Sequence, residues 1–73
     1  MKPDKFCDEL GRLYAVAATK GLVAQDLADF AQVSQTTMVK WIGGYECPDN
    51  DQRGGVLLDV ASGLGILAWW QAP

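Results

Sequence analysis

The sequence predicts a compact all-α domain of five short helices. Apolar residues recur at helical spacing in several separate stretches, glycine and other turn residues divide these stretches, and no strand is needed for the remainder. The 73 residues provide material for one core, because a chain of this length buries only about 60% of its unfolded surface on folding. We therefore expect residues 1–73 to form a single domain.

The first helix is predicted from Asp4 to Lys20. Asp4 and the acidic residues of the early turns suit a helix start, and Lys20 followed by Gly21 suits a helix end. One stripe of this helix is apolar, at positions i, i+4, i+7 and i+11: Phe6, Leu10, Leu13 and Ala17.

Two shorter helices are predicted next. The second spans Ala24 to Ala31, with Leu27, Ala28 and Ala31 as its inward positions. The third begins after Ser34, whose hydroxyl can accept hydrogen bonds from the free amides at the start of a helix. It ends at Gly43 and Gly44, and its inward residues are Met38, Trp41 and Ile42.

The rest of the chain is predicted to contain a long acidic loop and an apolar C-terminal segment. Residues 43–54, GGYECPDNDQRG, are rich in turn-forming residue types. With three acidic residues and one basic residue, this loop carries a net charge of −2. Residues 55–70 follow, with helical spacing of their apolar residues as far as Leu64, then Gly65 and a last apolar turn at 66–70.

Composition argues against several classes of protein. The chain has nine acidic and six basic residues, a net charge of −3, and the 49% hydrophobic content of an ordinary globular domain. It has no histidine, and its two cysteines, Cys7 and Cys47, are far apart in the sequence. Zinc sites and Cys/His or Ser/His nucleophile pairs therefore lack their residues. We expect no enzyme activity, no metal and no cofactor.

The sequence also bears on the compartment. Two cysteines are too few for the disulfide scaffold of a small secreted domain, and the first residues, MKPDK, open no apolar signal region. Residues 56–70 are apolar, but they include Asp59 and fall short of the roughly 20 residues that span a bilayer. We expect a cytoplasmic protein with reduced thiols and no membrane contact.

Three short helices, with the second and third joined by few residues, are typical of the helix-turn-helix unit. Residues 27–44, LADFAQVSQTTMVKWIGG, resemble without a gap the helix-turn-helix of the Cro and phage-repressor family. Pro48 and residues 57–66, LLDVASGLGI, look like that family's later segments. The resemblance implies a five-helix, lambda-repressor-like domain with its helix-turn-helix core at about 24–43. The positions that match that family are Leu27, Ala28, Val33, Ser34, Gln35, Thr37, Lys40, Trp41 and Gly44.

Several exposed positions depart from that family's pattern. The Thr-Gln pair that grips a DNA phosphate is replaced by Val23 and Ala24, and the glycine of the turn is replaced by Gln32. Ile42 and Gly43 stand where polar or basic residues follow the tryptophan, and the usually basic stretch beyond them is the acidic loop. Because phosphate neutralisation supplies most non-specific DNA affinity, these changes disfavour DNA binding.

One hypothesis is a sequence-specific DNA-binding repressor of the Cro type. The resemblance then implies that Gln35 reads an adenine edge, that Thr36 and Thr37 contact thymine methyl or phosphate, and that Lys40 reaches guanine or phosphate. The candidate DNA-binding residues are Ser34, Gln35, Thr36, Thr37 and Lys40.

The second hypothesis, which the acidic charge favours, is a regulator that binds a protein partner. An acidic surface complements basic patches, and exposed aromatic residues act as anchors in interfaces. The size and acidity resemble those of phage-encoded transcription factors that bind host RNA polymerase to inhibit initiation or prevent termination. This resemblance implies RNA polymerase as the partner, in the host cytoplasm. The candidate interface residues are Lys5, Asp8, Glu9, Arg12, Tyr45, Glu46, Asp49, Asp51, Trp69 and Trp70.

Overall fold

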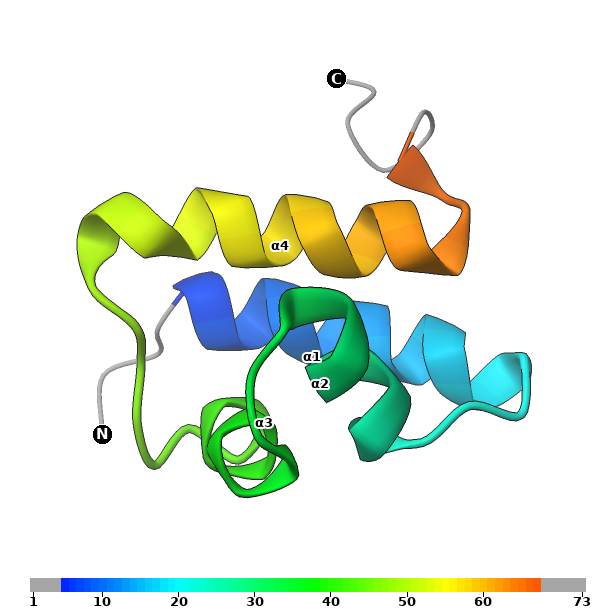
Figure 1. Cartoon of the computed structure of the whole chain (residues 1–73), viewed down its shortest axis with the longest axis horizontal. Coiled ribbons are helices and arrows are strands. Elements are labelled where there is room, and N and C mark those ends of the chain that lie inside the picture. The colour runs from blue at the N-terminus through cyan, green and yellow to red at the C-terminus, as the bar shows by residue number, and fades with distance from the viewer. Residues whose placement is uncertain (1–4, 68–73) are drawn as a thin grey trace.

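The computed structural model describes residues 5–67, which fold into four α-helices with no strand among them. The helices α1 and α4 lie side by side and run in the same direction in Figure 1. The shorter α2 lies in front of α1 in this view and packs against both α3 and α4, and α3 also contacts α1. Their bounds are α1 Lys5–Thr19, α2 Ala24–Ala31, α3 Gln35–Ile42 and α4 Asn50–Leu64. The all-α prediction is confirmed.

The number of helices differs from the prediction. Residues 5–67 contain four helices rather than five. The apolar turn expected at 66–70 lies mostly outside the described residues, and only Ile66 and Leu67 are placed. Ile66 is buried, so the chain continues to cover the core after α4 ends.

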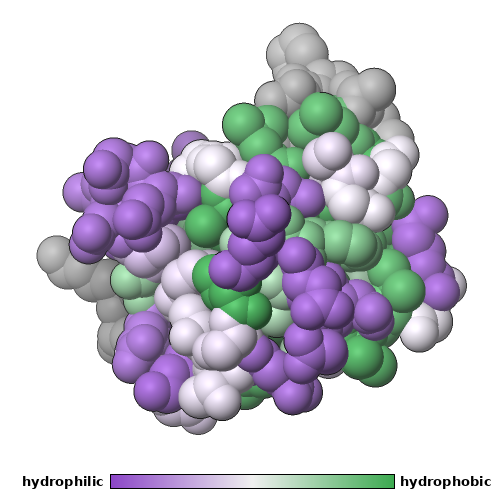
Figure 2. Space-filling model, viewed as in Figure 1, coloured by the Kyte–Doolittle hydropathy of each residue, from purple (hydrophilic) through white to green (hydrophobic). Residues whose placement is uncertain are grey.

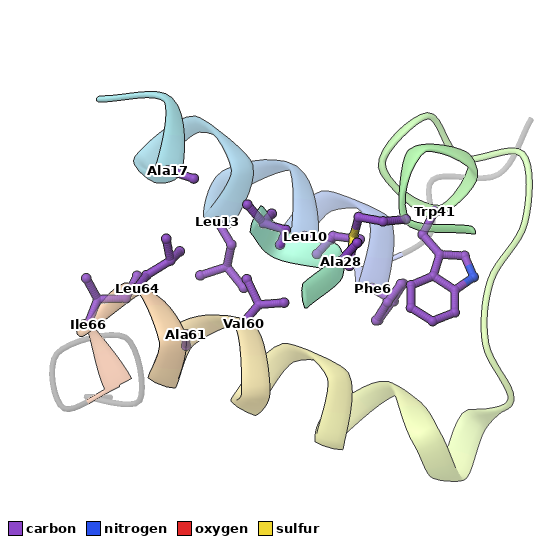
Figure 3. Packing of buried hydrophobic residues seen from close by; sticks show 12 residues of the cluster. Phe6, Leu10, Leu13, Ala17, Ala28, Trp41, Val60, Ala61, Leu64 and Ile66 are labelled. Carbon is purple, nitrogen blue, oxygen red and sulfur yellow. The ribbon is translucent and has the colours of Figure 1, made fainter. Parts of the chain in front are cut away.

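The core lies between the four helices, as Figure 3 shows. The apolar stripe predicted for α1 is buried along its whole length, from Phe6 to Ala17. At one end of the core, the rings of Phe6 and Trp41 meet edge to face, with their centroids 6.0 Å apart. The buried residues are Phe6, Leu10, Leu13, Ala17, Leu27, Ala28, Met38, Trp41, Val60, Ala61, Leu64 and Ile66.

The short helices begin and end where the sequence predicts. The N-cap of α3 is Ser34, whose Oγ accepts a hydrogen bond from the Thr37 backbone N–H at 3.1 Å. At the start of α2, the carboxylate of Asp26 accepts a hydrogen bond from the Val23 N–H at 2.8 Å. After α2, Gln32 adopts the left-handed conformation, with φ 59° and ψ 43°. The residue after α2 therefore has a left-handed backbone conformation although it is not glycine.

The predicted loop at 43–54 is wrong over its last five residues, because α4 begins at Asn50. The Asp49 carbonyl accepts hydrogen bonds from the N–H groups of Gln52 and Arg53, at 2.9 and 3.2 Å, which starts the helix. Residue composition is a weak guide to secondary structure where the residues that follow pack against a core, as those of α4 do. The segment that remains between helices, residues 43–49, is termed the α3–α4 loop below.

Among residues 5–67, no helix has both the length and the apolar character that a bilayer span requires.

Candidate functional site

The outer side of α3 and the start of the α3–α4 loop form a shallow hollow of about 570 Å³. Its largest exposed apolar side chains are Val39, which is 49% exposed, and Tyr45, which is 83% exposed. An apolar hollow at the protein surface is a candidate binding site. The residues that line it, which we name the α3 surface, are Gln35, Thr36, Val39, Lys40 and Tyr45.

The rotation of α3 determines which side chains reach this surface. Met38 and Trp41 point into the core, so the helix positions between and before them face outward. Residues at i, i+1, i+4 and i+5 lie together on one side of a helix. Gln35, Thr36, Val39 and Lys40 have this spacing, which explains why they line one surface.

The α3–α4 loop adds the fifth residue. After α3, Gly44 adopts a left-handed conformation with φ 79° that reverses the chain direction. The N–H of Tyr45 then donates a hydrogen bond to the Lys40 carbonyl at 2.9 Å, and the N–H of Glu46 donates to the same oxygen at 3.4 Å. These bonds hold the loop against the end of α3. The Tyr45 ring lies next to Gly43 and lines the same hollow as Val39 and Lys40.

The charge of Lys40 is matched within the site. Its Nζ lies 3.3 Å from Oε1 of Glu46, and the two side chains are 47% and 54% exposed. An ion pair this exposed contributes little to folding stability. The cation of the α3 surface is nevertheless balanced by an adjacent carboxylate.

The structure places the five candidate DNA-binding residues in two groups. The Ser34 hydroxyl donates to Oγ1 of Thr37 at 2.9 Å while accepting from the Thr37 backbone, so both hydroxyls serve the start of α3. Gln35 and Thr36 are exposed, and with Lys40 they belong to the α3 surface.

The acidic candidate residues Glu46, Asp49 and Asp51 are exposed and lie near the start of α4. Glu46 is next to the α3 surface, Asp49 is the N-cap residue of α4, and Asp51 lies in the first turn of that helix. Figure 2 shows hydrophilic side chains gathered over the start of α4. The site is thus an apolar hollow with acidic residues to one side of it.

The remaining candidates lie on α1 or outside the described residues. Lys5, Asp8 and Arg12 are exposed on α1, and Nη1 of Arg12 lies 3.6 Å from Oε1 of the half-buried Glu9. The structure does not bring these four residues onto the α3 surface. Trp69 and Trp70 fall outside residues 5–67.

Two structural features are missing from both candidate sets. Val39 follows the buried Met38 directly, and this position off the inward stripe is the signal that could have identified it. The second feature is the approach of Cys7 to Cys47, whose Sγ atoms are 3.5 Å apart. Nothing in the sequence spacing indicates this contact.

Comparisons with known proteins identify no relative: the chain matches no protein-family model, no curated protein and no solved structure. Within the described range 5–67, no three His, Cys, Asp or Glu side chains are grouped so that they could hold a metal ion. Any function must therefore be argued from the chain's own surface.

Proposed function

We propose that this protein is a small phage-type transcription regulator that acts, without catalysis, by binding a protein partner through the α3 surface. The observation that carries this proposal is the apolar hollow around Val39 and Tyr45, in which Lys40 is already paired with Glu46. The resemblance of residues 27–44 to a helix-turn-helix supports the setting of transcription. Host RNA polymerase is the proposed partner, with inhibition of initiation or antitermination as the outcome.

The charge balance favours a protein over DNA at this surface. Sites that bind DNA typically make about 6–10 phosphate contacts through cationic and polar groups. The α3 surface offers one cation, Lys40, and DNA binding would place Glu46 near the same phosphates. The DNA would have to compete with this carboxylate for the lysine, whereas a protein partner could leave the ion pair intact.

The surface also indicates the chemistry of the partner. The hollow can take an apolar side chain against Val39 and the ring of Tyr45. The exposed carboxylates of Glu46 and Asp49 lie on the loop that borders it. We therefore propose a partner segment with an apolar anchor residue and a neighbouring Lys or Arg, because aromatic contacts supply affinity and charge complementarity supplies orientation.

Calorimetric titration of the full chain into purified RNA polymerase tests this proposal. The native chain should bind, and Tyr45→Ala should weaken binding by roughly 10-fold or more, as expected for an aromatic anchor. Val39→Thr should weaken binding. The matched control Val23→Thr should not, because it alters an exposed valine that lies away from the hollow. Equal affinity for all of these variants, or no binding by the native chain, would show that the α3 surface is not the polymerase site.

Binding of DNA is the second candidate function, and one observation favours it. Gln35 and Thr36 are exposed at the N-terminal end of α3, where the helix-turn-helix resemblance places base-reading side chains. Titration with random and mixed-sequence duplexes at several salt concentrations tests it.

A repressor should bind duplex with an affinity that falls steeply with salt. In that case Lys40→Gln should reduce the slope of log affinity against log salt by about 1, and the control Lys20→Gln should leave it unchanged. Such a result would replace the protein-partner proposal with the DNA-binding one. Polymerase binding without measurable duplex binding would exclude the repressor.

A further inference from the structure

Two thiols that are distant in the sequence lie against each other in the fold. Cys7 belongs to the first turn of α1, Cys47 belongs to the α3–α4 loop, and their Sγ atoms are 3.5 Å apart in a half-buried position. Both are present as thiols. Since an S–S bond is about 2.05 Å long, the sulfur atoms would need to approach by roughly 1.5 Å for a bond to form.

The fold fixes both sides of this contact. On α1, the preceding residue Phe6 is buried against Trp41, which sets the direction in which the next side chain leaves the helix. On the loop, Pro48 is buried, and its carbonyl accepts a hydrogen bond from Nε of Arg53 at 3.0 Å. Cys47 is attached to this anchored residue, so the approach of the thiols is a consequence of packing.

We propose that Cys7 and Cys47 are an oxidative modification site that closes to an intramolecular disulfide. The oxidant is a low-molecular-weight disulfide such as oxidised glutathione. One cysteine thiolate attacks this disulfide and releases one glutathione, and the other cysteine then attacks the mixed disulfide and releases the second. The two protein thiols lose two electrons and two protons in total, and the oxidised glutathione becomes two thiols.

The bond would connect the start of α1 to the loop that carries Tyr45 and Glu46. It joins positions 40 residues apart, so it restricts the unfolded chain strongly. We expect the melting temperature of the oxidised chain to rise by roughly 10–20 °C, from the stabilisation typical of native disulfides in small domains. This inference concerns the thiols alone and does not depend on the proposed partner.

Equilibration of the full chain in buffers of reduced and oxidised glutathione, with and without urea, tests the proposal. After alkylation, intact mass should show a monomer that has lost two hydrogens and accepts no alkyl group. The equilibrium constant for this closure should be roughly 30- to 900-fold larger in the native chain than in urea, because the bond stabilises the fold by the same factor.

The variants Cys7→Ser and Cys47→Ser provide the matched controls. Each should keep its circular dichroism spectrum and form a mixed glutathione disulfide without closure. Equal constants in native buffer and urea, or accumulation of mixed disulfides or covalent dimers by the native chain, would overturn the proposal. The comparison between native buffer and urea uses the unaltered chain, so it holds even if a variant fails to fold.

Discussion

The inner and outer sides of α3 belong to the same eight-residue helix, yet different interactions determine them. On the inner side, Met38 and Trp41 are buried by residues of the other helices. On the outer side, Val39 and Lys40 share a hollow with Tyr45 of the α3–α4 loop, and Lys40 is paired with Glu46 of the same loop. The helical spacing of apolar residues determines which side chains are buried on the inner side. The surface on the outer side depends on the path of the α3–α4 loop.

The largest expected effect comes from truncating a buried side chain on the inner side of α3. Trp41→Ala deletes a buried ring that meets Phe6 edge to face, so it leaves a cavity at one end of the core. We expect a loss of about 3–5 kcal/mol in the free energy of unfolding, measured by urea denaturation followed by circular dichroism. A domain this small has little stability beyond that amount, so part of the variant should be unfolded in water.

The outer side of the same helix provides the control. Val39→Ala should change the free energy of unfolding by less than about 0.5 kcal/mol, because surface substitutions away from special features have small effects. If Val39→Ala proved as costly as Trp41→Ala, the hollow would be part of the core and the distinction between the two sides would be wrong.

This contrast also explains what could be predicted from the sequence. The stripe from Phe6 to Ala17, the bounds of α2 and the N-cap at Ser34 follow from local patterns, and the structure confirms each of them. The start of α4 could not be predicted in this way. Residues 50–54 have the composition of a loop, and they are helical because the residues after them pack on α1 and α2.

The candidate site was predictable only in part. Gln35, Thr36 and Lys40 could be identified as exposed from their positions on α3, and Tyr45 as an exposed aromatic residue. Their assembly into one hollow depends on the left-handed turn at Gly44 and the hydrogen bonds that follow it. The ion pair and the thiol contact are likewise tertiary, and no spacing rule in the sequence indicates a pair formed through a loop.

The next prediction concerns the packing of α2 against α4. The half-buried ring of Phe30 lies against Gly63 of α4, and a Cβ at position 63 would overlap this ring. Gly63→Ala should therefore lower the free energy of unfolding by about 1 kcal/mol, because the packing penalty exceeds the gain in helix propensity.

The matched substitution lies on the same helix. Gly55→Ala meets no atom within 4 Å, so it should raise the free energy of unfolding by about 0.5–1 kcal/mol. Urea denaturation of both variants should give effects of opposite sign. In a Phe30→Ala background the difference between them should disappear, and its persistence would rule out the ring as the cause.

The smallest expected effect concerns the turn that joins the two short helices. Gln32 is the one non-glycine residue with positive φ among residues 5–67, at 59°. Gln32→Gly relieves the cost of a Cβ in this conformation, partly offset by the greater freedom of glycine in the unfolded chain. We expect a gain of about 0.5 kcal/mol in the free energy of unfolding, measured by urea denaturation. The control Gln52→Gly, within α4, should lose about 0.5–1 kcal/mol. A loss at both positions would mean that the Gln32 side chain stabilises the turn by more than its backbone conformation costs.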